Sequence, residues 1–292
     1  MPTFETPNPI SVDLELGVGD VRIDAAERTD TVVEVRPTDP GKPGDVSAAE
    51  QTRIDYAGGR LVVRGPRGWR QWSPRSGGDS IDVQISLPEG SQLAADVAMA
   101  PLRSTGRLGD CRYKTGIGDI DVAEAADVAL RTGAGNVTVD HAAGDLAAST
   151  GSGVVQIGAV DGSAVVKNSN RETRIGEVTG ELRVKAANGS ISVDRAHAAV
   201  AARTANGDVT LGSVGPGAVD AQTAFGRIEV GIADGLAAWL DLDTRFGRVI
   251  NGLADVQRPD PGEATIEVRA RTSYGDISVH RALADDAWQG AE

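Results

Sequence analysis

Large aromatic side chains are scarce in this chain of 292 residues, which has 3 Phe, 3 Tyr and 4 Trp beside 37 Gly. A globular core of this size usually packs many large side chains, whereas stacked repeats need small residues at tight corners and aliphatic residues between them. The single cysteine, Cys111, excludes an internal disulfide bond. The composition therefore favours a repeat architecture over a compact globular core.

Positive charge is also in deficit. The formal net charge is −13, whereas general binding to nucleic-acid phosphates needs a basic surface. No apolar run approaches the roughly 18 residues of a membrane-spanning helix. The N-terminal residues MPTFETPNPI have neither the basic stretch nor the apolar stretch of a signal peptide. We therefore expect a cytoplasmic protein with no membrane span and no general nucleic-acid binding.

An internal repeat dominates the rest of the sequence, and segments such as TGIGDIDV, TGAGNVTV, TANGDVTL and TSYGDISV are copies of it. One glycine position recurs at residues 118, 135, 153, 171, 189, 207, 226, 247 and 275, and only Arg171 departs from glycine. The steps are 17, 18, 18, 18, 18, 19, 21 and 28 residues. Such a period is typical of solenoids, in which one copy cannot bury its apolar face alone and stacks on its neighbours.

Each copy contains two short segments in which apolar and polar residues alternate, which predicts two strands with one buried face each. The residues expected to point inward are Val128, Leu130, Leu182, Val184, Leu240 and Leu242, and those expected to point outward are Arg131, Lys185 and Asp243. The predicted fold class is all-β: a single-stranded-type β-solenoid (β-helix) of about nine coils of roughly 18 residues, with a β-rich N-terminal cap section.

We expect three parts along the chain. Residues 1–100 form the β-rich section that caps the solenoid, residues 101–280 form the repeats, and residues 281–292 form a C-terminal cap or tail. Caps are needed because an open solenoid end exposes strand edges and core. Strand-like runs in the first part are Ser11–Leu16, Thr31–Arg36, Leu61–Arg64 and Ser80–Leu87. In the last part, a short helix over Arg281–Gln289 would cover the final coil.

The repeated glycine indicates a corner that needs a positive φ or has no room for a Cβ atom. A threonine three residues before the glycine shares the inner side of its strand, so its hydroxyl group should bond within the corner. In the last three copies an aromatic residue precedes the glycine: Phe225, Phe246 and Tyr274. We expect these rings to stack as a packing ladder rather than to form a cofactor-binding box.

The segment VDLELGVGDVRI, followed by IDVQISLPEGSQL and by repeated TGxGxVxV units, resembles a bacterial family of β-strand-repeat proteins. That family is labelled "putative adhesin" and is otherwise a domain of unknown function. The resemblance covers roughly residues 10–280. It implies a β-solenoid and an association with the cell envelope, and it brings no catalytic residues with it.

Side chains for catalysis or for metal or cofactor binding do not converge in the sequence. His141, His197 and His280 lie far apart in the repeat, without metal-ligand spacing. The outward positions of the strand after the glycine hold no two neighbouring carboxylates for acid–base chemistry. We therefore predict a non-catalytic interaction or scaffold protein with no catalytic, cofactor-binding or metal-binding residues. The alternative is a carbohydrate-active enzyme on a β-helix frame.

One candidate partner-binding site is the loop from Arg64 to Arg75, which contains Trp69, Arg70 and Trp72. Tryptophan and arginine are enriched at binding hot spots. The alternative interpretation is that both tryptophans fold back over the N-terminal section.

A second candidate is a column of basic residues just before the threonine position, formed by Lys114, Arg131, Lys167, Lys185 and Arg203. Stacked coils would place these like charges ~4.8 Å apart. Either carboxylates such as Asp127, Asp145 and Glu181 compensate them, or the column meets an acidic protein or an anionic polymer. The identity of the partner stays unknown at this stage, and self-association stays open.

Overall fold

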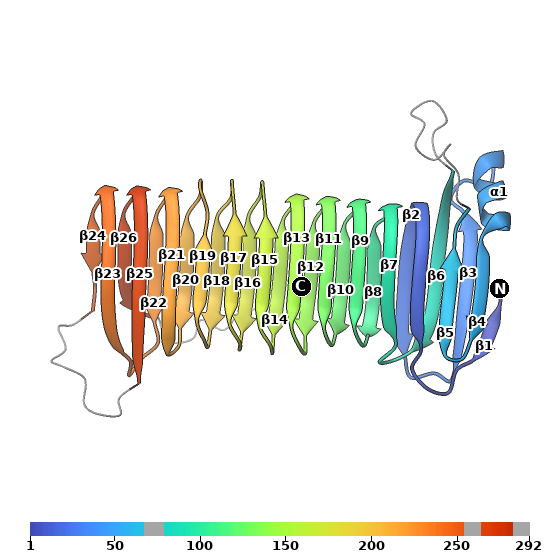
Figure 1. Cartoon of the computed structure of the whole chain (residues 1–292), viewed down its shortest axis with the longest axis horizontal. Coiled ribbons are helices and arrows are strands. Elements are labelled where there is room, and N and C mark those ends of the chain that lie inside the picture. Colours follow the sequence, from blue (N-terminus) through green and yellow to red (C-terminus); the bar gives the residue numbers. More distant parts are fainter. Residues whose placement is uncertain (67–78, 254–263, 283–292) are drawn as a thin grey trace. The chain divides into compact units, whose positions relative to one another are not determined.

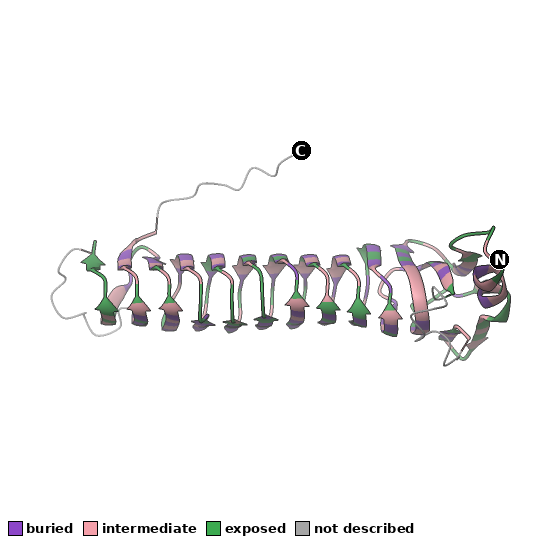
Figure 2. Ribbon diagram, turned by 90° about the horizontal axis from the view of Figure 1, so that it is seen from above, coloured by how far each residue is buried: buried purple, intermediate pink, exposed green. Residues whose placement is uncertain are grey.

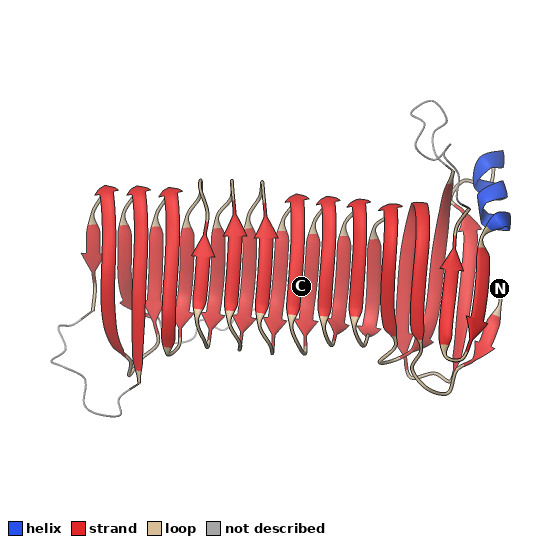
Figure 3. Ribbon diagram, viewed as in Figure 1, coloured by secondary structure: helices blue, strands red, loops and turns tan. Residues whose placement is uncertain are grey.

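The computed structural model describes residues 1–66, 79–253 and 264–282 (Figure 1). Contacts divide the chain into two compact units, Met1–Gly158 (unit 1) and Ala159–Glu292 (unit 2). In each unit, coils of two strands stack so that their strands form two columns of parallel strands (Figure 3). The predicted all-β solenoid with a β-rich N-terminal section is therefore confirmed. The part boundaries near residues 100 and 280 stay predictions, and residues 283–292 of the expected C-terminal cap lie outside the described residues.

Unit 1 begins its stack with strands that come from separate parts of the sequence. Its first column has the spatial order β5 (Arg60–Arg64), first half of β2 (Ser11–Ala26), β7 (Gln92–Met99), β9 (Cys111–Ile117), β11 (Val128–Ala134) and β13 (Leu146–Ser152). Its second column has the order β6 (Ser80–Pro88), second half of β2, β8 (Leu102–Arg107), β10 (Ile120–Ala125) and β12 (Val137–Ala142). Strand β14 (Val155–Val160) spans the boundary of the units.

Antiparallel strands cover the first coil of unit 1. β3 (Asp30–Pro37) pairs with β6, β4 (Arg53–Ala57) pairs with β5, and β1 (Thr3–Glu5) pairs with β3. The sequence did not predict helix α1 (Pro43–Gln51), which starts with a proline where the missing N–H group costs nothing. Its buried Asp45 accepts a hydrogen bond from the Ser80 amide at 3.0 Å. This cover protects an edge that would otherwise be open for pairing.

The described part of unit 2 consists of stacked two-strand repeats. Its first column has the spatial order β15 (Ala164–Asn168), β17 (Leu182–Ala186), β19 (Val200–Arg203), β21 (Gly217–Phe225), β25 (Thr265–Tyr274) and β23 (Ala237–Phe246). Its second column has the order β16 (Thr173–Val178), β18 (Ile191–Ala196), β20 (Val209–Val214), β22 (Ile228–Ile232), β26 (Ile277–Arg281) and β24 (Val249–Asn251).

Spatial order differs from sequence order at one end of each unit. In unit 2 the β25/β26 coil lies between the β21/β22 coil and the β23/β24 coil, although it comes last in the sequence. In unit 1, β2 lies between the β5/β6 coil and the β7/β8 coil, although it precedes both. Each inserted segment is hydrogen-bonded along both edges, so it cannot fray without breaking two ladders.

The burial pattern follows the predicted strand register in the interior coils (Figure 2). The side chains predicted to point inward at positions 128, 130, 182 and 184 are buried, and Arg131, Lys185 and Asp243 are exposed. The prediction was wrong for Leu240 and Leu242, which are only half-buried. The reason is the inverted order: among the described strands, β23 is the outermost of its column and has a strand partner on one side only.

Threonine and glycine together build the corner, as the sequence predicts. Six of the threonine hydroxyls donate to the carbonyl of a repeated glycine in a neighbouring coil, for example Thr223 to Gly207 at 2.9 Å and Thr272 to Gly226 at 3.1 Å. Thr115 instead donates to the Ile117 carbonyl of its own coil at 3.0 Å. Gly207 has φ 145°, and a Cβ atom there would overlap the Gly189 carbonyl. Both expected reasons for glycine therefore apply at this position.

One coil builds its corner differently. It has Asn168 at the threonine position and Arg171 at the glycine position. The Asn168 amide donates to the carbonyl groups of Arg171 at 2.9 Å and Glu172 at 3.0 Å. This side chain thus closes the corner within its own coil.

Candidate interaction edge

The residue before each repeated glycine, or before the residue that occupies the glycine position in another coil, lies at the corner and faces solvent. We call the set of these residues in a unit its corner column. In unit 1 it consists of Val18, Met99, Ile117, Ala134 and Ser152, which are in register on neighbouring strands. In unit 2 it consists of Asn170, Asn188, Asn206, Phe225, Tyr274 and Phe246. Its members are exposed or half-exposed, so the fold leaves their chemistry free to vary.

Three aromatic rings form one half of the unit 2 corner column. The centroids of Phe225 and Tyr274 are 5.0 Å apart at an interplanar angle of 3°, and those of Tyr274 and Phe246 are 4.8 Å apart at 11°. The predicted packing ladder is confirmed, with Tyr274 in the middle because its coil is the inserted one. The rings remain 54%, 49% and 63% exposed for Phe225, Tyr274 and Phe246. Because each ring covers its neighbour's face, the stack presents mainly ring edges to solvent.

Three amides form the other half. The Asn188 side chain donates to the Asn170 carbonyl oxygen at 3.3 Å, and the Asn206 side chain donates to that of Asn188 at 2.8 Å. A side-chain amide has two N–H groups and two acceptor lone pairs. The ladder uses one N–H group each from Asn188 and Asn206, which leaves hydrogen-bonding capacity on the exposed side. The sequence analysis missed this ladder, although an asparagine precedes the repeated position in three successive copies.

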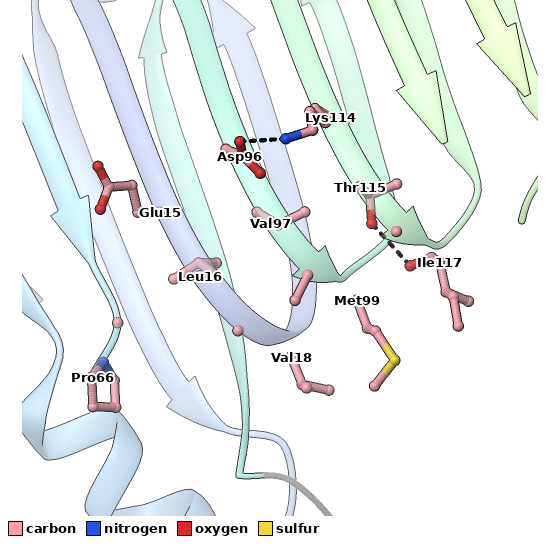
Figure 4. Close-up of a pocket in the computed structure, with 14 residues that line it drawn as sticks. Glu15, Leu16, Val18, Pro66, Asp96, Val97, Met99, Lys114, Thr115 and Ile117 are labelled. Atoms are coloured by element: carbon pink, nitrogen blue, oxygen red, sulfur yellow. Dashed lines mark hydrogen bonds and ion pairs between the residues drawn. The ribbon is translucent and has the colours of Figure 1, made fainter. Parts of the chain in front are cut away.

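A groove of about 750 Å³ lies beside the corner column of unit 1 (Figure 4). It is formed by the middle of β2 and the ends of β7 and β9, together with Gly65 and Pro66. Met99 and Ile117 form an apolar wall, and Lys114 in the opposite wall pairs with Asp96 at 2.8 Å. A Cβ atom on Gly116 would lie 2.7 Å from the Ala98 carbonyl, so backbone forms the floor. The groove therefore offers apolar side chains for contact, and the charge of its lysine is compensated by Asp96.

The predicted basic column is divided between the units. Lys114 and Arg131 are in register in unit 1, and Lys167, Lys185 and Arg203 are in register in unit 2. All five side chains are exposed.

Compensation by carboxylates differs along this column. Asp96 pairs with Lys114, and Asp220 pairs with Arg203. Glu181, expected to compensate the column, instead pairs with Arg183 at 3.0 Å. In the part of the chain that the structure describes, no carboxylate lies within ion-pair distance of Lys167 or Lys185. The other predicted binding residues, Trp69, Arg70 and Trp72, lie outside the described residues.

The cysteine and two of the histidines, which could in principle take part in catalysis, lie in environments that explain them structurally. Burial raises the pKa of the Cys111 thiol to about 12, as expected for an inward-facing cysteine. His197 and His280 lie beside glutamates of neighbouring coils, Glu177 at 2.6 Å and Glu229 at 3.1 Å. Among residues 1–66, 79–253 and 264–282, no group of three histidine, cysteine or acidic residues is arranged to hold a metal ion.

The fold and the corner columns define a β-solenoid repeat protein. The chain belongs to the Toastrack DUF4097 family, whose model matches residues 9–237. The resemblance to the "putative adhesin" β-strand-repeat family is thereby confirmed. No curated protein matches the chain. Within the described segments, no helix is long and apolar enough to cross a membrane.

The chain is also similar to solved structures. One is a "putative cell adhesion protein" from Clostridium sporogenes, with 12% identity and a TM-score of 0.27, where the match covers 96% of this chain and 98% of the other. Another is a "putative adhesin" from Bacteroides fragilis, with 12% identity and a TM-score of 0.34, covering 95% of each chain.

Proposed function

We propose that the protein is a non-catalytic interaction module that binds a macromolecular partner along the corner column of unit 2. The observation that carries this proposal is the exposed stack of Phe225, Tyr274 and Phe246. Contiguous exposed apolar side chains mark interaction sites, and aromatic residues are enriched at the centres of protein interfaces.

The fold itself does not require aromatic rings at this position. Other coils of the same repeat place Ile117, Ala134, Ser152 or an asparagine there. A stacked aromatic pair adds about 0.5–1.5 kcal/mol, and a ladder of exposed amides can supply a comparable stabilisation. Stability alone therefore does not explain why three successive coils in space all carry a large ring that remains about half exposed.

The alternative, a carbohydrate-active enzyme, needs two carboxylates close to each other. Asp121 is one acidic residue on the outward face of the second column, and its neighbours in register are Arg103 and Thr138. Glu229 is the other acidic residue at the outward position three residues after the repeated glycine, and its neighbours are Thr210 and Ser278. Neither of these carboxylates has an acidic neighbour in register. Asp20 and Asp82 are in register with each other, but Asp20 pairs with Arg22 and Asp82 accepts a hydrogen bond from Thr38. We therefore favour the interaction module.

The test is a capture experiment with the source cell's extract. Soluble and envelope fractions are run separately, because we expect a cytoplasmic protein whereas the family resemblance implies an association with the cell envelope. The variant combines Phe225→Ser, Tyr274→Ser and Phe246→Ser. The control combines Val165→Ser and Met99→Ser, which remove exposed apolar side chains outside the stack. We expect the stack variant to lose a partner that the wild type and the control retain. A folded stack variant that keeps every partner would overturn the proposal.

A further inference from the structure

We propose that the amide half of the corner column and the lysines beside it form a binding strip for an unbranched anionic polysaccharide. The strip has three parallel columns from three successive coils of unit 2: Lys167, Lys185 and Arg203; Ser169, Ala187 and Ala205; and Asn170, Asn188 and Asn206. This inference rests on the proposed function, because it uses the same edge of unit 2, and it assigns a ligand class to the non-aromatic half.

The strip carries uncompensated positive charge. Lys167 and Lys185 lie side by side on β15 and β17, ~4.8 Å apart along the stack. Like charges at that spacing repel unless something compensates them. Arg203, the next residue of the column, has Asp220 as its partner, whereas no carboxylate among the described residues reaches either lysine. In a chain with net charge −13, this local excess of positive charge favours a negatively charged ligand.

The strip also carries hydrogen-bonding groups. The asparagine ladder runs parallel to the lysine column, and each asparagine lies three residues after a basic residue in the same coil. Its exposed amides offer donors and acceptors that recur at the coil spacing. A ligand with hydroxyl groups on every unit can use both kinds of group, whereas a simple polyanion uses only the cations.

The strip is open to a ligand. The column between lysine and asparagine carries only Ser169, Ala187 and Ala205, and all three are exposed. These small side chains let a flat ligand approach the backbone closely. The strip also lacks aromatic anchors of the kind that dominate protein–protein hot spots. An acidic protein partner would fit the neighbouring aromatic stack better.

The consensus sequence of the repeat is not kept in the first coil of this strip. Asn168 and Arg171 replace the threonine and the glycine in the coil where the asparagine ladder starts. Departures from a structural consensus tend to occur at functional sites, where stability is traded for another requirement. The exposed Arg171 adds a further cation next to Asn170.

The experiment measures binding of polygalacturonate at low salt and at physiological salt by titration calorimetry. Polyglutamate, duplex DNA and neutral dextran are the comparison ligands. One variant combines Lys167→Gln with Lys185→Gln, and a second combines Asn188→Ala with Asn206→Ala. The matched control combines Arg174→Gln with Arg248→Gln, which removes the same charge outside the strip. Circular dichroism and the thermal midpoint establish that each variant is folded.

We expect the lysine variant to weaken polygalacturonate binding by about tenfold or more and the control to leave it unchanged. We expect the asparagine variant to weaken polygalacturonate binding while the weaker binding of polyglutamate stays the same. Salt should weaken the interaction, and dextran should not bind. Absence of polygalacturonate binding would overturn the inference, as would equal binding of polyglutamate with no effect of the asparagine variant. Because the aromatic residues are intact in all these variants, such a failure would leave the capture result for the stack unaffected.

Discussion

The two halves of the unit 2 corner column use the same backbone position for different chemistry. In the amide half, Asn188 and Asn206 reach the preceding coil through side-chain hydrogen bonds of 3.3 and 2.8 Å. In the aromatic half, rings stack at centroid distances of 5.0 and 4.8 Å. Both ladders repeat at the spacing that parallel strands impose. The corner geometry thus fixes where these side chains stand, whereas residue choice at one solvent-facing position decides which chemical groups the edge presents to solvent.

The corner glycine between the halves should carry the largest effect. Gly207→Ala forces a Cβ atom into the Gly189 carbonyl at a φ of 145°, so we expect a loss of about 2–4 kcal/mol in the free energy of unfolding. Gly235→Ala is the control: its φ is also positive, at 78°, but nothing lies within 4 Å of the added Cβ. We expect it to cost about 1–2 kcal/mol. Denaturant unfolding measures both variants, and equal losses would show that the close approach between coils does not matter.

The aromatic half should depend most on its middle ring. Tyr274→Asn removes two stacking contacts and Phe246→Asn removes one. At about 0.5–1.5 kcal/mol for each stacked pair, Tyr274→Asn should cost roughly twice as much. The comparison also checks the inverted coil order, because in sequence order Phe246 would be the middle ring. A larger loss for Phe246→Asn, in thermal or denaturant unfolding, would contradict the order β21, β25, β23.

A smaller effect is expected at an ion cluster that lies in the same coils as the amide half. The hydrogen bond from His197 lowers the pKa of Glu177, with a further contribution from the charge of Arg195. A lowered pKa in the folded state means that the interaction contributes stability at pH values above the unfolded pKa of the carboxyl group. That contribution is lost as the pH falls through the folded pKa.

Glu177→Gln tests this cluster. We expect the substitution to reduce stability at pH 6 by less than about 1 kcal/mol, because the pair is well exposed, and to have little effect below the folded pKa. Thermal midpoints at pH 6 and pH 3 check this. A loss that grows towards acidic pH would have the wrong sign.

The sequence predicted the corner well because its determinants are local. The spacing of glycine and threonine, the strand register and the stacking of Phe225, Phe246 and Tyr274 all follow from one repeated pattern. The sequence analysis missed the order of the last two coils because both copies fit the same pattern equally well.

The sequence does contain a sign that the β23/β24 coil lies outside the β25/β26 coil, at the end of β24. Asn251 pairs with the inward-facing Val279, but Asn251 itself is exposed. A polar residue at an inward position is tolerable only where no further coil covers it. The repeat step of 28 residues between Gly247 and Gly275 is also longer than every other step.

The candidate site was only partly visible in the sequence. The lysine column could be read from strand parity, because Lys167 and Lys185 occupy equivalent positions in successive coils. The sequence could not show which of these charges are compensated. Asp96 and Asp220 approach Lys114 and Arg203 through side-chain conformations that no repeat pattern encodes. The asparagine ladder is visible in the sequence as an asparagine before the repeated position in three successive copies, at 170, 188 and 206.

The most direct test of the account is site-specific photo-cross-linking in the source cell. A benzophenone side chain replaces Phe225 in the exposed stack or, as a control, the exposed Thr179 elsewhere in unit 2. The account predicts a discrete cross-linked product of higher mass from position 225 that is absent from position 179. Equal products from both positions, or none from position 225 in a protein that is shown to be folded, would contradict the claim that the corner column of unit 2 is an interaction edge.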